Sequence, residues 1–348
     1  MNKISASIFL AMAVMTAIFL PACGDNPKTQ TPTVATAPAA KTEPTPVKKE
    51  LPVLRAYRGE EVTSPILFYI GDSLGFFQEY GVKVNVVGVL PAGQLVAAVV
   101  SGKLDIGGAH VNRTIAGISA GASIKAVVAS TETSQRIPHM VGITNKNSPI
   151  KKSADLVGKK VGLARSGGCH EYTPYAYLKK NGVPDPKNSV EIIILPERIL
   201  QQALRQGEID LAMMHRTPEQ IEQDGEFDIL FSDYDVWGIV GGATPTYFSR
   251  DFIKENPEVV RSYVNGMAKT INWANANPYE SRRITAERTN TPIDEIHEGL
   301  WAKDGIIHKD TVTMWVDLLK EFGEIKNHVE AEQVYTNEFN NFALNQGL

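Results

Sequence analysis

Two segments of the sequence share one pattern that ends in His, and the position of this His indicates a binding role. The segments Ser101 to His110 and Gln206 to His215 share the order Gly, any residue, hydrophobic, Asp, hydrophobic, then a short apolar run and His. Each copy follows an apolar helical pattern that ends at the Gly. The apolar runs Leu104 to Ala109 and Ile209 to Met214 predict strands buried between helical layers. Ligands bind at the carboxyl edge of such sheets, so we expect both histidines near one cleft, unless each caps its own loop.

A second candidate is the Gly-rich segment made of Ser166, Gly167, Gly168, Cys169 and His170, between a predicted strand and a predicted helix. Two glycines let backbone N–H groups approach a ligand, and a helix start offers unpaired donors with partial positive charge. We therefore expect an anionic group here, the alternative being a tight turn with Ser166 as its N-cap. Cys169 at the helix start is either acidified and reactive or a buried inert thiol.

Other side chains bear on the chemistry of the ligand. Arg216 follows His215 directly and favours an anion in the same cleft, the alternative being a surface pair with Glu219. Trp237 either stacks on a flat ligand or packs in the core. Cys169 and the histidines are types that bind transition metals, but they lack a compact spacing such as His-x-x-x-His. The sequence therefore predicts no metal and no cofactor, and it contains no nucleophile elbow or phosphate-binding loop.

Length and charge set the class of protein. With 348 residues and 43% hydrophobic content, the chain is long enough for more than one domain. A formal net charge of -4 gives no basic surface for nucleic acid, so none is expected as a partner. Residues 1–22 read as a signal peptide, and Leu20-Pro21-Ala22-Cys23 resembles a bacterial lipobox. Residues 23–50 are then a lipidated Cys23 and a disordered tether rich in Pro, Thr and Ala.

From Pro52 onward, strand and helix patterns alternate, as in an α/β protein with mainly parallel sheets flanked by helices. We place lobe I at residues 51–145 and 235–348, including the C-terminal helices, and lobe II at residues 146–234. Helices are expected over Ile66 to Tyr80, Ile293 to Trp301 and Ala331 to Ala343, among others.

Six short motifs occur in one order between about residues 53 and 320: Gly75-Phe76-Phe77-x-x-x-Gly81-Val82-x-Val84, Ser101-Gly102-x-x-Asp105, Ala120-Gly121-Ala122, Asp155-Leu156-x-Gly158-Lys159-x-Val161, Leu204-x-x-Gly207-x-x-Asp210 and Pro257-x-Val259. With the lipobox, they resemble the solute-binding proteins of ABC importers in the branch that serves nitrate, sulfonate, taurine and thiamine-precursor uptake. The resemblance implies a two-lobed periplasmic binding protein fold of type II, with two crossovers between the lobes. It also implies ligand positions at Ser64, Gly93, Gln94, His110, Asn112, Thr131 and Ser166 to His170. Near His110 and His215 this chain departs from the family. It has His-Val-Asn and His-Arg-Thr, where many relatives have Gly and Pro.

We therefore predict a monomeric, lipid-anchored binding protein of the cell envelope rather than an enzyme. It would capture a small organic ligand, with an anionic, sulfonate, carboxylate or heterocyclic group, and deliver it to an ABC permease and its ATPase. His215, Arg216 and Trp237 complete the predicted ligand site. The alternatives are a metal or metal-chelate carrier, and an enzyme of the same fold that resembles a pyrimidine-synthesising one.

Overall fold

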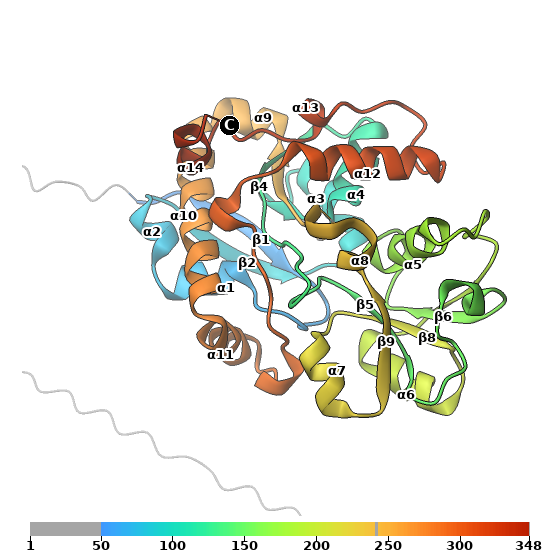
Figure 1. The fold of residues 1–348 in the computed structure, drawn as a ribbon. Helices are drawn as coiled ribbons and strands as arrows, with labels where there is room; N and C mark the ends of the chain where they lie inside the picture. Colours follow the sequence, from blue (N-terminus) through green and yellow to red (C-terminus); the bar gives the residue numbers. More distant parts are fainter. Residues whose placement is uncertain (1–49, 241–242, 348) are drawn as a thin grey trace, which may run out of the picture. The chain divides into compact units, whose positions relative to one another are not determined.

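A computed structural model gives the structure of the protein and describes residues 50–240 and 243–347. The predicted signal peptide, Cys23 and the tether up to residue 49 lie outside the described residues. Within residues 50–240 and 243–347, no helix combines the length and the apolar character needed to cross a membrane. The described chain forms two lobes, which Figure 1 shows with the second lobe in green and yellow.

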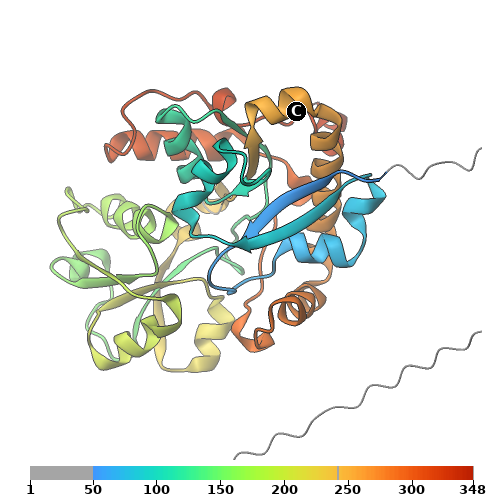
Figure 2. The ribbon, with the colours of Figure 1, turned by 180° about the vertical axis from the view of Figure 1, so that it is seen from behind.

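The strands make three sheets. In the first lobe, β1 and β2 pair in parallel, as the blue and cyan ribbons of Figure 2 show, and β10 lies antiparallel between β3 and β4. In the second lobe, the five-stranded sheet has the order β7-β6-β8-β5-β9, with β6 parallel to both β7 and β8. The bounds are β1 (Val53–Arg58), β2 (Lys83–Val89), β3 (Gly107–Gly108), β4 (Ile124–Val128), β5 (Val141–Asn145), β6 (Lys160–Leu163), β7 (Glu191–Ile194), β8 (Leu211–Met214), β9 (Phe227–Ser232) and β10 (Thr246–Ser249).

Helices cover these sheets, and the C-terminal part of the chain returns to the first lobe, where α10 packs along α1 and α2 (Figure 1). The bounds are α1 (Leu67–Ser73), α2 (Phe76–Glu79), α3 (Leu95–Val100), α4 (Val111–Ser119), α5 (Cys169–Lys180), α6 (Glu197–Gln206), α7 (Pro218–Asp224), α8 (Asp233–Trp237), α9 (Arg250–Glu255), α10 (Pro257–Ala276), α11 (Pro278–Thr289), α12 (Lys309–Glu321), α13 (Ala331–Val334) and α14 (Asn341–Asn345).

The repeated sequence pattern has the same structural role in each lobe. The Gly of the pattern lies at or just after the end of a helix. Its φ is positive, 72° at Gly102 and 71° at Gly207. The Asp of the pattern then accepts a hydrogen bond from a backbone N–H of an earlier strand: Asp105 from Arg55 of β1 at 2.7 Å, and Asp210 from Lys160 of β6 at 2.9 Å. The pattern thus fixes the start of the next strand against β1 or β6. It thereby determines the position of the His at its end, His110 or His215.

Several sequence predictions are corrected by the structure. Val141–Asn145 was expected in lobe I, but β5 pairs with β8 and β9 and belongs to the second sheet. The predicted strand Leu104 to Ala109 is reduced to β3, where Gly107 lies so close to the Tyr247 ring that a Cβ would stand 2.2 Å from it. The helix expected over Ile66 to Tyr80 breaks at Gly75, whose φ is 73°.

The C-terminal helix predictions were also too long. Only Ile293–Glu295 is helical in the segment 293–301, as a 3-10 turn, and the chain then runs without regular secondary structure to a bridge between Thr131 and Trp301. Between residues 331 and 343, helix is confined to α13 and the start of α14. The irregular segment that follows Glu295 reaches the space between the lobes at residues 297–301.

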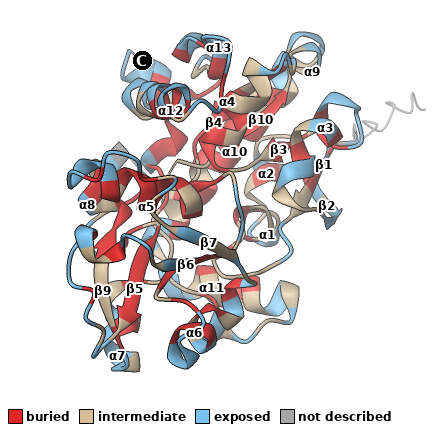
Figure 3. Cartoon of the chain, turned by 90° about the vertical axis from the view of Figure 1, so that its right-hand side faces the viewer, coloured by how far each residue is buried: buried red, intermediate tan, exposed pale blue. Residues whose placement is uncertain are grey.

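The core of the second lobe continues into the first. One cluster of buried side chains contains Met140 and Tyr172 from the second lobe together with Ile115 and Trp315 from the first. Figure 3 shows that β4, β5 and β10 consist mostly of buried residues. The residues at the junction of the lobes are therefore held by packing from both sides.

Candidate functional site

A cavity of about 340 Å³ lies between the two lobes. The first lobe lines it from the end of β1 through the start of α1 and again at His110. The second lobe contributes the start of α5 and His215, and the connecting segments contribute Thr131, His139 and Thr244. A cavity of this volume suits a small molecule.

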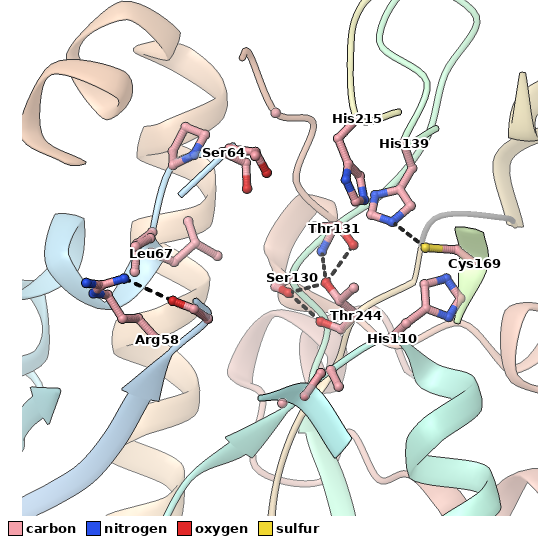
Figure 4. A pocket seen from close by; sticks show the side chains of 18 of the residues that line it. Arg58, Ser64, Leu67, His110, Ser130, Thr131, His139, Cys169, His215 and Thr244 are labelled. Atoms are coloured by element: carbon pink, nitrogen blue, oxygen red, sulfur yellow. Dashed lines mark hydrogen bonds between the residues drawn. The ribbon is translucent and has the colours of Figure 1, made fainter. Parts of the chain in front are cut away.

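One wall of the cavity gathers a cysteine and its neighbouring histidines, which we name the Cys169 cluster: Cys169, His110, His139, His170 and His215. His110 precedes α4, His139 precedes β5, and His215 directly follows β8. The Cys169 Sγ lies 3.4 Å from His139 Nε2 and 3.8 Å from His170 Nδ1. Figure 4 shows the labelled members of the cluster turned toward one another, with the contact between His139 and Cys169 dashed.

The imidazole rings in this wall form a continuous set. The centroids of His170 and His215 are 4.6 Å apart, those of His139 and His215 are 5.0 Å apart, and those of His110 and His139 are 5.7 Å apart. Cys169 and His170 are the first two residues of α5, and both are buried. The sequence therefore brings these side chains together from four separate segments.

A buried carboxylate, Glu197, lies behind the cluster. Glu197 is the first residue of α6, and only 3% of it is exposed. It accepts hydrogen bonds from the His215 backbone N–H at 2.6 Å and from His215 Nδ1 at 2.9 Å, and it lies 3.7 Å from His170 Nε2. Burial opposes charge on His215, but the Glu197 carboxylate outweighs it and raises the pKa of His215 to about 10. The same contacts hold the pKa of Glu197 well below its usual value, against its burial.

The thiol of Cys169 is shifted toward its anionic form. Burial raises its pKa, but His110, His139 and His170 together outweigh burial and hold the pKa well below the usual value for a thiol. A thiolate is both the nucleophilic form of cysteine and its metal-binding form.

Charged side chains of both signs line the cavity: the arginines are Arg58, Arg113 and Arg165, and the glutamates are Glu60, Glu61, Glu132 and Glu298. Arg113 lies on α4 of the first lobe and donates a hydrogen bond to the carbonyl oxygen of Ser166 in the second. Asn112, next to it, donates from Nδ2 to the Gly167 carbonyl at 2.8 Å. The Gly-rich segment is therefore tied across the cavity edge to α4, and a guanidinium group lies beside it.

Hydroxyl groups form the floor between these walls in Figure 4. The Thr244 Oγ1 lies 2.6 Å from Thr131 Oγ1 and 2.8 Å from Ser130 Oγ. Ser64 lies on the wall opposite the Cys169 cluster, near Arg58 and Leu67. Hydroxyl groups at this floor suit a ligand with hydrogen-bonding groups of its own.

The structure divides the sequence-predicted ligand residues into two sets. Those that line the cavity are Ser64, His110, Thr131, Gly168, Cys169, His170 and His215. Those outside its lining are Gly93, Gln94, Asn112, Ser166, Gly167, Arg216 and Trp237.

Each residue of the second set has another structural role. Gly93 and Gln94 lie in a 3-10 turn, Ala92–Gln94, whose neighbours Ala92 and Leu95 reach the cavity instead. Arg216 pairs with Asp224 at 2.9 Å, so its guanidinium is engaged within its own lobe, with Asp224 rather than Glu219 as its partner. Trp237 packs against Trp315 with ring centroids 4.8 Å apart.

Sequence reasoning missed His139, Arg113, Arg165, Glu197 and His297. Arg113 could have been predicted from the sequence, because it lies three residues after His110 at the start of a helix. Glu197 likewise begins the helix that leads into the second repeat. His139 carries no such signal, since it belongs to an irregular connection whose position depends on contacts between distant segments.

The comparisons with known proteins agree on one group. The family model described as NMT1/THI5 like matches residues 63–281. No curated protein matches the sequence. Among solved structures, the periplasmic aliphatic sulphonate binding protein SsuA from Escherichia coli has a TM-score of 0.63 at 19% identity, over 81% of this chain and 91% of that one.

Two further structures are similar at low identity. The periplasmic nitrate-binding protein NrtA from Synechocystis has a TM-score of 0.64 at 14% identity, covering 85% of this chain and 89% of that one. A ligand-binding component of an ABC-type import system from Staphylococcus aureus, solved with zinc bound, has a TM-score of 0.66 at 13% identity, covering 83% and 97%. The predicted fold is confirmed: an α/β periplasmic binding protein fold of type II.

Proposed function

Because the chain belongs to the NMT1/THI5-like family, we propose that it is the extracytoplasmic solute-binding component of an ABC importer. The observation that carries this proposal is the cavity of about 340 Å³ between the lobes, lined by side chains of both. A ligand that touches both lobes favours the conformation in which they close on it. The protein would then present the closed, loaded form to a permease and its ATPase.

The solute we propose is a small molecule with an anionic group. Arg58, Arg113 and Arg165 line the cavity, and Ser130, Thr131 and Thr244 add hydroxyl groups. Such donors suit the oxygen atoms of a sulfonate or carboxylate. Arg113 replaces Arg216 as the arginine expected to matter most, because it lies where both lobes meet the ligand.

Substitution of Arg113 provides a direct test of the ligand's charge. We expect Arg113→Ala to weaken binding of an anionic solute about tenfold to a hundredfold, since each lost charge-assisted hydrogen bond costs roughly 1.5 to 3 kcal/mol. Arg216→Ala is the matched control and should leave affinity unchanged, because Arg216 pairs with Asp224 outside the cavity lining. Titration calorimetry of both variants decides: equal losses, or tighter binding of a cation by Arg113→Ala, would contradict the assignment.

We further propose that Cys23 carries lipid and holds the protein at a membrane on the periplasmic or extracellular side. Cleavage at the lipobox before Cys23 would leave the Pro-rich tether between the lipid and the two lobes. We expect Cys23→Ser to move the protein from the membrane fraction to the soluble fraction, with Cys169→Ser as the control that stays in the membrane fraction. Membrane association of Cys23→Ser would place the anchor elsewhere.

Thermal unfolding of the full chain tests the binding function itself. A ligand at about a hundred times its Kd stabilises the folded state by about 2.7 kcal/mol, so the low-mass fraction of the host's culture medium should raise the Tm. Individual sulfonates, carboxylates and nitrate then identify the active class. An unchanged Tm with the whole low-mass fraction would contradict a role in solute capture. Release of the ligand in a chemically altered form would also contradict it.

A further inference from the structure

We infer that the Cys169 cluster is a binding site for a transition-metal ion of the zinc class, held by a thiolate and imidazoles. As a description of the transported solute this rests on the proposed function, because the ion would be imported together with the small anion. As a description of the site it stands on geometry alone. We assign Cys169, His170 and His215 as ligands; Cys169, His110 and His139 form a second triad that shares the same thiol.

The distances within the cluster match those between ligands of one ion. Zinc binds thiolate sulfur at about 2.3 Å and imidazole nitrogen at about 2.0–2.1 Å, so sulfur and nitrogen ligands of a tetrahedral ion lie about 3.6 Å apart. The Cys169 Sγ is 3.4 Å from His139 Nε2 and 3.8 Å from His170 Nδ1. One ligand atom from each of Cys169, His170 and His215 lies within 4.8 Å of the others, and the same is true of Cys169, His110 and His139.

The outer partners of two ligands also fit. Histidines that bind a metal usually point their second ring nitrogen at a carboxylate or carbonyl, which fixes the ring. His215 Nδ1 lies 2.9 Å from the buried Glu197 carboxylate, so Nε2 is left for the ion. His170 Nε2 is buried and lies 3.7 Å from the same carboxylate, while its Nδ1 is the nitrogen near Cys169.

The choice of ion follows from the donor set. One thiolate with imidazoles is typical of zinc and of the metals that share its preference for sulfur and nitrogen, whereas calcium and magnesium prefer oxygen. So many imidazoles beside one thiol would be costly to bury as separate charged groups. A shared cation offsets that cost, because its ligands bind as thiolate and neutral imidazole.

Cobalt spectroscopy on the full chain tests the site. After chelator treatment, added Co²⁺ should give the intense visible bands of tetrahedral cobalt and a near-ultraviolet band from the thiolate–cobalt bond, and Zn²⁺ should abolish both. Cys169→Ser should lose the thiolate band, whereas Cys23→Ser, the other thiol in the sequence, should keep it. His215→Ala should weaken Zn²⁺ binding about 100-fold or more, while His328→Ala, an exposed pair with Glu330, should not.

A measurement on the wild-type protein tests the site without depending on whether the variants fold. Zn²⁺ should slow alkylation of the Cys169 thiol, located by peptide mass spectrometry, and a parallel arm with zinc citrate tells whether a small anion enters with the ion. A cobalt spectrum identical to that of the ion in water, or Cys169 alkylation at the same rate with and without Zn²⁺, would overturn the inference. If the metal site fails these tests but a metal-free anion raises the Tm, the proposed binding function is still supported.

Discussion

Trp315→Ala should lower the free energy of unfolding by about 3–5 kcal/mol, the range for removing a fully buried aromatic side chain. Trp315 lies on α12 and is among the largest fully buried side chains in the described chain. Its ring centroid is 4.4 Å from that of His110, 4.8 Å from that of Trp237 and 6.3 Å from that of Tyr172. It therefore supports the wall of the cavity as well as the junction between the lobes.

Denaturant unfolding measures this effect, with the midpoint and the slope compared between variants. Thr313→Ala is the matched control, because Thr313 is an exposed residue on the same helix and should change stability little. A loss below about 1 kcal/mol for Trp315→Ala would mean that the packing around His110 is looser than the ring contacts indicate.

Glu197→Ala should destabilise the protein by about 3–5 kcal/mol, as expected when one partner of a buried ionic contact is removed. The substitution leaves the His215 backbone N–H and the His215 ring without their acceptor, and it removes the carboxylate beside His170. The pKa of His215 should then fall, because the carboxylate that raises it most is gone.

The measurement is denaturant unfolding in the presence of chelator, so that bound metal does not contribute. Glu222→Ala on α7 is the control, since Glu222 is exposed and its loss should matter little. Equal stability of the two variants would show that Glu197 is not the counter-charge of the cluster.

The sequence repeat predicted more of the site than any single motif did. The Gly of each copy lies at a left-handed helix end, and the Asp of each copy accepts a hydrogen bond from a strand 50 residues earlier, so one pattern marks the same position in both lobes. The structure brings His110 and His215 to the same cavity, as the repeat led us to expect.

Features set by distant contacts were not predictable in the same way. The apolar run of β5 fits either sheet, and only its pairing with β8 and β9 assigns it to the second lobe. His139 joins the Cys169 cluster because of that pairing. Arg216 looked poised for a ligand from its place after His215, but Asp224, on the following helix, binds it.

Native mass spectrometry tests the central claim, that a solute is captured between the lobes and carried unchanged. The full chain, Arg113→Ala and Arg216→Ala would be isolated in parallel from the host without dialysis. We predict a low-mass ligand on the first and third proteins, released without chemical change on denaturation, and a largely empty Arg113→Ala. Equal occupancy of all three proteins, or a ligand released as a reaction product, would contradict the account.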